Sequence, residues 1–91
     1  MEKNLTFTIS ITHNRKNYKY TVERISVTTR EETYRLTASN KTLTFINNRP
    51  LLQKKKLKHW KPTWTMHGEL WNIYFRELII KAIEEKLGLS S

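Results

Sequence analysis

The sequence predicts a small α+β domain in which a four-stranded antiparallel β-meander packs against one C-terminal α-helix. Three observations support this prediction. Apolar and polar residues alternate along the first part of the chain, short polar turns separate the alternating segments, and helix-forming residues dominate toward the C-terminus. The chain has 91 residues, which fits a single compact domain spanning residues 1–91. A chain of this length has room for one hydrophobic core.

The strands are predicted from a period of two, which is the period at which side chains return to the same face of a sheet. In the first strand, apolar side chains at odd positions alternate with hydroxyl-bearing ones. In the second, the apolar residues change from even to odd positions, which predicts a bulge near Glu23 and Arg24. The strands are expected at about residues 4–12, 18–28, 31–39 and 41–46.

A basic connection is expected at residues 47–64. It begins with Asn47 and Asn48, which favour a turn, and Pro50, which cannot donate a hydrogen bond to a sheet. Residues 51–64 show no clean period and Pro62 interrupts them, so we expect a loop or one short helical turn over residues 51–61. The connection therefore separates the meander from the helix.

The C-terminal helix is expected at about residues 68–87, with Gly88 as the left-handed residue that closes it. One side of the helical wheel carries an apolar stripe that should pack on the sheet: Trp71, Tyr74, Phe75, Leu78, Ile79 and Ala82. A second apolar set repeats every seven residues on the other side, as a seam for a partner or a second copy: Ile73, Ile80 and Leu87. Alternatively, the basic connection or the C-terminal tail covers this seam.

The positive charge is concentrated in one part of the chain. The sequence has 17 Lys and Arg residues against 8 acidic ones, a formal net charge of +9. Eight of the basic residues and none of the acidic ones lie between Thr33 and Gly68, so this segment carries +8 and the remainder only +1. Such an asymmetry favours polyanionic partners. The eight residues are Arg35, Lys41, Arg49, Lys54, Lys55, Lys56, Lys58 and Lys61.

Lysine and tryptophan alternate near the end of the basic connection, a combination found in grooves that bind single-stranded nucleic acid. We therefore predict a nucleic-acid-binding module of low sequence specificity, for DNA or RNA. Its expected phosphate contacts and one stacking residue are Arg49, Lys54, Lys55, Lys56, Lys58, Lys61 and Trp60. Two alternatives stay open. The lysines could form a solvated loop, and the tryptophans could be core residues, with burial favoured for Trp64 and undecided for Trp60.

The sequence offers few residues for catalysis or metal binding. It has no cysteine and no aspartate, and its two glycines cannot form a glycine-rich phosphate loop. The adjacent pairs Glu31–Glu32 and Glu84–Glu85 are expected on solvated faces, because neighbours in a strand or helix do not form an acid–base dyad. The histidines lack metal-ligand spacing: His13, His59 and His67. We expect no enzymatic activity, no cofactor and no metal site.

No run of residues approaches the roughly 20 apolar residues of a membrane span, and the first residues lack the apolar core of a signal peptide. The expected location is therefore the cytoplasm. Two other functions are alternatives to nucleic-acid binding. One is a homo-oligomeric or adaptor domain that docks through the helix seam, and the other is attachment to an anionic membrane surface.

The predicted order, four strands followed by one helix, is similar to that of the positive-coactivator and Pur-alpha families. This resemblance is one of element order over the whole chain, without a shared motif. It implies a small sheet-plus-helix module that dimerises and binds single-stranded nucleic acid.

Overall fold

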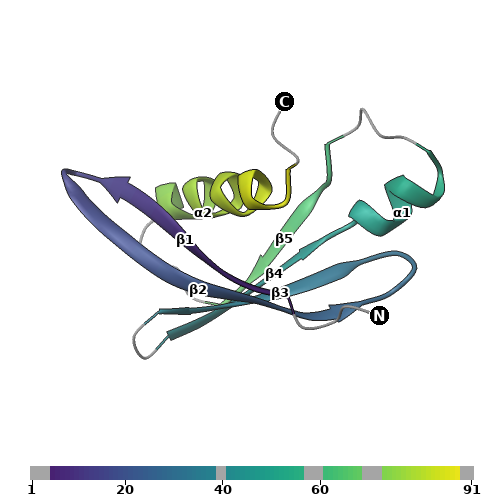
Figure 1. Cartoon of the computed structure of the whole chain (residues 1–91), viewed down its shortest axis with the longest axis horizontal. Coiled ribbons are helices and arrows are strands. Elements are labelled where there is room, and N and C mark those ends of the chain that lie inside the picture. The colour runs from purple at the N-terminus through teal and green to yellow at the C-terminus, as the bar shows by residue number, and fades with distance from the viewer. Residues whose placement is uncertain (1–4, 39–40, 57–60, 69–72, 89–91) are drawn as a thin grey trace.

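The computed structural model describes residues 5–38, 41–56, 61–68 and 73–88. It contains one antiparallel five-stranded sheet and two helices, so the predicted α+β class and the C-terminal helix are confirmed (Figure 1). Neighbours in the chain are neighbours in the sheet, in the order β1-β2-β3-β4-β5. The strands are β1 (Leu5–His13), β2 (Lys16–Val27), β3 (Glu32–Ala38), β4 (Lys41–Asn47) and β5 (Trp64–His67), and the helices are α1 (Arg49–Lys54) and α2 (Ile73–Lys86).

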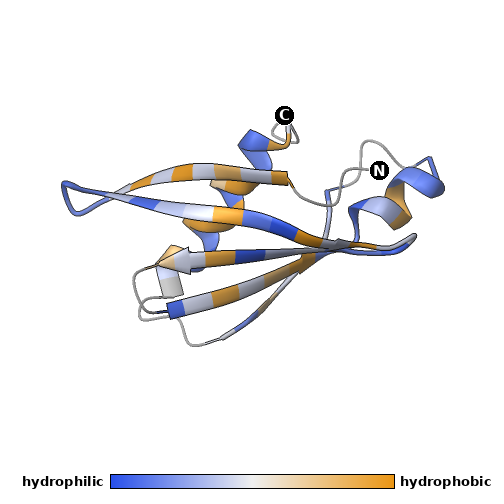
Figure 2. Cartoon of the chain, turned by 60° about the horizontal axis from the view of Figure 1, so that its bottom comes forward, coloured by the Kyte–Doolittle hydropathy of each residue, from blue (hydrophilic) through white to orange (hydrophobic). Residues whose placement is uncertain are grey.

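The core lies on one face of the sheet. Apolar side chains from all five strands occupy this face, because the alternation predicted from the sequence is in register across the strand pairs. Figure 2 shows the alternation of hydrophobic and hydrophilic residues along the strands. The opposite face carries mainly threonine, serine and charged side chains. The buried apolar residues of the sheet are Ile9, Ile11, Tyr20, Val22, Tyr34, Leu36, Leu43, Phe45 and Trp64.

The expectation of four strands was wrong by one. Strand β5 begins at the last residue of the predicted connection and continues to the start of the predicted helix. It pairs with the end of β4 from Asn47↔Trp64 to Thr44↔His67. Four residues are too few for a period of two to stand out from chance. Gly68 ends the strand with a φ of +119°, and a Cβ there would come within 2.8 Å of Leu43 Cδ2. Glycine is therefore required where the chain leaves the sheet.

The bulge predicted in the second strand is confirmed. The register between β2 and β3 shifts between Arg24 and Ser26, so Ile25 is the extra residue. Before the shift, Arg24 stands opposite Tyr34 and therefore on the core face of the sheet. Because Arg24 has the same parity as the buried Tyr20 and Val22, its guanidinium group lies at the edge of the core, directly before the bulge.

Helix α2 lies on the concave side of the sheet, between β1 and β5 (Figure 1). Its buried residues follow a spacing of four, with Phe75, Ile79 and Ile83 almost fully enclosed. Leu78 and Ala82, predicted in the stripe, are partly buried against the same core. Tyr74 was expected in the stripe as well, but it is 70% exposed. Trp71 lies outside the described residues.

Because α2 lies between two strands, the core covers more of its circumference than a flat sheet would. Ile80 is only 8% exposed, and Leu87 packs partly against the core of its own chain. These two residues of the predicted seam are therefore covered within one chain, and the side chain of Ile73 is outside the description. Gly88 has a φ of +74° directly after the helix, as predicted for the closing residue.

Replacing Ile83 with alanine should lower the free energy of unfolding by about 2–5 kcal/mol, because the side chain is fully buried between helix and sheet. Tyr74→Ala, on the exposed side of α2, should change it by less than about 0.5 kcal/mol. Urea unfolding followed by tryptophan fluorescence measures both. Equal losses in the two variants would contradict this orientation of α2.

Candidate nucleic-acid interface

Lys54, Lys55 and Lys56 of the basic connection lie on and directly after helix α1, a short helix at one end of the sheet (Figure 1). Pro50 in its first turn suits a helix start, because its missing N–H would have no partner there. Leu52 is the buried residue of this helix. The end of α1 is closed by backbone hydrogen bonds from Lys55 N to Leu51 O and from Lys56 N to Gln53 O, both 3.0 Å.

Two asparagines tie the start of α1 to the sheet. The side-chain oxygen of Asn47, at the end of β4, accepts a hydrogen bond from the backbone N–H of Arg49 at 2.8 Å. The side-chain oxygen of Asn48 accepts one from the backbone N–H of Thr63, just before β5, at 2.7 Å. The two ends of the basic connection are thereby held beside each other.

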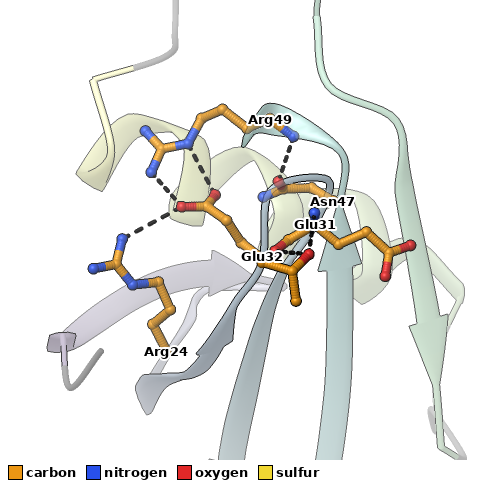
Figure 3. Close-up of polar contacts among 6 residues, drawn as sticks. Arg24, Glu31, Glu32, Asn47 and Arg49 are labelled. Atoms are coloured by element: carbon orange, nitrogen blue, oxygen red, sulfur yellow. Dashed lines mark hydrogen bonds and ion pairs between the residues drawn. The ribbon is translucent and has the colours of Figure 1, made fainter. Parts of the chain in front are cut away.

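Helix α1 forms an ion pair with Glu32, the first residue of β3 (Figure 3). Arg49 donates from Nε to Oε1 at 2.9 Å and from Nη2 to Oε2 at 2.6 Å, the two-pronged geometry that is most favourable for this pair. Arg24 adds a second, longer contact from Nη1 to Oε2 at 3.3 Å. The Glu32 side chain is only 3% exposed, so its charge is balanced by arginine rather than by water.

Burial by itself would raise the pKa of Glu32. The hydrogen bonds and positive charge of Arg49 outweigh that effect, with help from Asn47 and Tyr34, and hold the pKa of Glu32 below its usual value. The same hydrogen bonds raise the pKa of Arg49. Burial, followed by the nearby Glu32 charge, raises the pKa of Tyr34 to about 12. The cluster therefore keeps Glu32 ionised and Tyr34 neutral around pH 7.

Two donors beside this cluster are not fully used. The Tyr34 hydroxyl and the Asn47 amide nitrogen are buried, and neither forms a hydrogen bond of standard geometry with a described residue. Both nevertheless favour the ionised form of Glu32 and so help to lower its pKa. Four side chains thus stabilise one buried carboxylate.

The expectation that Glu31 and Glu32 both lie on solvated faces was wrong for Glu32. Glu31 is exposed in the turn before β3, where its N–H donates to Thr28 Oγ1 at 2.9 Å. Glu32 has the same parity as Tyr34 and Leu36, and therefore faces the core. That parity was the signal in the sequence, whereas the partner, 17 residues away at Arg49, comes from the tertiary fold.

The predicted phosphate contacts fall into three groups. Lys54, Lys55, Lys56 and Lys61 are exposed, and no salt bridge between described residues involves them. Arg49 is 18% exposed and already engaged with Glu32. Lys58 and Trp60 lie outside the described residues. An interface on this end of the molecule therefore depends on lysines rather than on Arg49.

Trp64 is a core residue, as the sequence favoured. It is 9% exposed, its ring lies 6.0 Å from that of Tyr34, and its Nε1 donates to Glu84 Oε2 at 2.9 Å. The carbonyl oxygen of Trp64 accepts a 3.2 Å hydrogen bond from Arg76 Nη2. Trp64 therefore joins β5 to α2 and is not available to stack on a base.

Among the described residues, no three His, Cys, Asp or Glu side chains gather closely enough to hold a metal ion. Within that same part of the chain, no helix has the length and hydrophobicity needed to cross a membrane.

Comparisons with protein-family models, with curated proteins and with solved structures find no match to this chain. No family model or solved structure therefore supports the resemblance in element order to the positive-coactivator and Pur-alpha families. Strand β5 is also an additional element in that order.

Glu32→Gln should lower the free energy of unfolding at pH 7 by about 3–5 kcal/mol, because it leaves Arg24 and Arg49 without a counter-charge in a largely buried place. Glu23→Gln is the matched control. Its pair with Arg35 is exposed, so the loss should stay below about 1 kcal/mol. Equal losses on urea unfolding would contradict the assigned role of Glu32.

The acid stability of the unmodified chain provides a second measurement. The pKa of Glu32 is lower in the folded state than its ordinary value of 4.5, so ionised Glu32 stabilises the fold. This stabilisation is complete above pH 4.5. It should be lost as the pH falls from there toward the folded-state pKa. The free energy of unfolding, measured at a series of pH values, should therefore fall more steeply below pH 4.5 for the unmodified chain than for Glu32→Gln.

Proposed function

We propose that this protein is a small non-enzymatic domain that binds nucleic acid through phosphate contacts, with low sequence specificity. The observation that supports this most directly is the set of four exposed lysines on and after α1 and before β5: Lys54, Lys55, Lys56 and Lys61. They belong to the segment that carries nearly the whole net charge.

The structure supports the proposal by giving these lysines a fixed base. Helix α1 is held by the ion pair of Arg49 with Glu32, and the two ends of the connection are joined by the hydrogen bond from Thr63 to Asn48. A cluster of like charges repels itself, and this repulsion is relieved when a polyanion replaces the counterions. Binding phosphates is the simplest use of such a cluster.

Low sequence specificity follows from the residue types. Lysine contacts to phosphate carry no base information, and single-strand binding adds stacking on aromatic side chains. Trp64 is buried, so Trp60 remains the residue proposed to stack. The open face of the sheet carries threonines and charged residues rather than the Phe, Tyr and Trp residues that would favour stacking there.

The test is a fluorescence-anisotropy titration of labelled single- and double-stranded DNA and RNA oligonucleotides at several salt concentrations. Four or five phosphate contacts on a single strand predict a slope of roughly −3 for log affinity against log salt. Reversing Lys54, Lys55 and Lys56 to Glu removes three phosphate contacts, so the slope should become less steep, at about −1. Circular dichroism checks that the variant remains folded.

A charge-matched control separates a local interface from general attraction. Arg15, Lys16 and Lys19 are exposed at the β1–β2 hairpin, at the opposite end of the molecule from α1 (Figure 1). Reversing all three to Glu changes the net charge by the same amount. The slope of log affinity against log salt should stay close to that of the unmodified chain. An equal effect of both triple variants, or no binding near 50 mM salt, would reject the lysine interface.

A further inference from the structure

The first strand of the sheet has a long free edge. β1 pairs with β2 on one side, and no described strand pairs with its other side. His13 and Lys16 close a two-residue turn, so their backbones exchange two hydrogen bonds. Hydrogen-bonded pairs alternate along an antiparallel hairpin, so the odd-numbered residues of β1 bond to β2. The backbone groups that point outward are consequently those of the intervening residues: Thr6, Thr8, Ser10 and Thr12.

This edge lacks the features by which sheet edges are commonly protected. From Leu5 to Thr12 it has no lysine, proline or glycine, and its register with β2 continues without a bulge. The exposed residues on it are threonine and serine, which favour strands or tolerate them. A regular, uncharged edge of this kind can pair with another strand.

A groove runs along the free edge, between β1 and α2. It consists of two adjoining hollows of about 400 Å³ and 220 Å³. Both are lined by Ser10 on the strand side and by Ala82 and Glu85 on the helix side. The strand supplies backbone hydrogen bonds along one wall, and the helix supplies side chains along the other, which is the geometry of strand addition.

We propose that the occupant of this groove is β1 of a second copy of the chain, so that two five-stranded sheets join into one across a two-fold axis. The sequence of the edge is self-complementary, because Thr8-Ile9-Ser10-Ile11-Thr12 reads the same in both directions. An antiparallel pair centred on Ser10 places Thr8 opposite Thr12 and Ile9 opposite Ile11. Hydroxyls then meet hydroxyls, and apolar side chains meet apolar ones.

The backbone agrees with this register. The residues whose N–H and C=O groups point outward have even numbers, and pairing around Ser10 sets even-numbered residues opposite even-numbered residues. Ser10 and its copy exchange two hydrogen bonds, as do Thr8 and Thr12. Isologous contacts of this kind close into a dimer and do not extend into a fibre.

Helix α2 leaves room for the second sheet. Besides packing on β1, it is hydrogen-bonded to β5 through Glu84 and Arg76, which draws it away from the free edge. Its numbering runs opposite to that of β1, since Thr12 shares a hollow with Leu78 and Thr8 shares one with Lys86. Under the two-fold axis the two copies of α2 are antiparallel, so the exposed Lys81 and Glu85 of one copy face Glu85 and Lys81 of the other. These charges are complementary.

The test is the oligomeric state, measured by sedimentation velocity over a range of protein concentrations. The unmodified chain should dimerise. Ser10→Lys and Ser10→Glu each place like charges directly opposite each other at the two-fold axis, so each alone should dimerise more weakly by on the order of tenfold. An equimolar mixture of the two variants should form a heterodimer, because the charges then attract.

Thr37→Lys is the matched control, since Thr37 is exposed on the same face but lies on the central strand β3. It should dimerise as the unmodified chain does. Rescue in the mixture shows that the charged variants are folded. A monomeric unmodified chain at millimolar concentration, an equal effect of Thr37→Lys, or failure of the mixture to pair would overturn the proposal. None of these outcomes depends on nucleic-acid binding.

Discussion

The basic end of the molecule depends on the ion pairs that the buried Glu32 carboxylate forms with Arg49 and Arg24. Glu32 begins β3, faces the core, and is neutralised by one arginine from the β2 bulge and one from the start of α1. Three segments that are separate in sequence therefore meet at one charge. A buried ion pair is not by itself a source of stability, because desolvation offsets its attraction, but breaking it is costly. Its effect here is to determine where α1 lies.

The position of α1 in turn determines where the lysines are displayed. The chain leaves β4 through two asparagines, and Asn48 also holds the residue that precedes β5. The two ends of the basic connection are thus joined, and its lysines at positions 54 to 56 lie at one end of the sheet (Figure 1). Without this closure the same lysines would lie in an open loop, where repulsion would spread them apart.

A second constraint is the curvature of the sheet around α2. The helix packs on β1 and is hydrogen-bonded to β5, so it spans the concave side from one edge strand to the other (Figure 1). This placement covers Ile80 and Leu87 within one chain, and it removes the reason to assign them to a partner. The surface left for a partner is instead the outer edge of β1, where a groove separates strand from helix.

The sequence alone determined the class of fold, the first four strands, the bulge in β2 and the closing glycine of α2. All of these arise from local patterns: a period of two, a change of parity, and a left-handed residue after a helix. The burial of Trp64 was anticipated from the residue type. The concentration of charge, which underlies the proposed function, is likewise a property of the sequence.

The tertiary structure decided what depends on partners distant in the chain. β5 exists because β4 offers an edge to a segment too short to show a pattern of its own. Glu32 is buried because Arg24 and Arg49 converge on it, and Tyr74 is exposed because α2 turns Phe75, Ile79 and Ile83 toward the sheet. Periodicity shows that a residue belongs to a face, but only packing decides which face is covered, and by what.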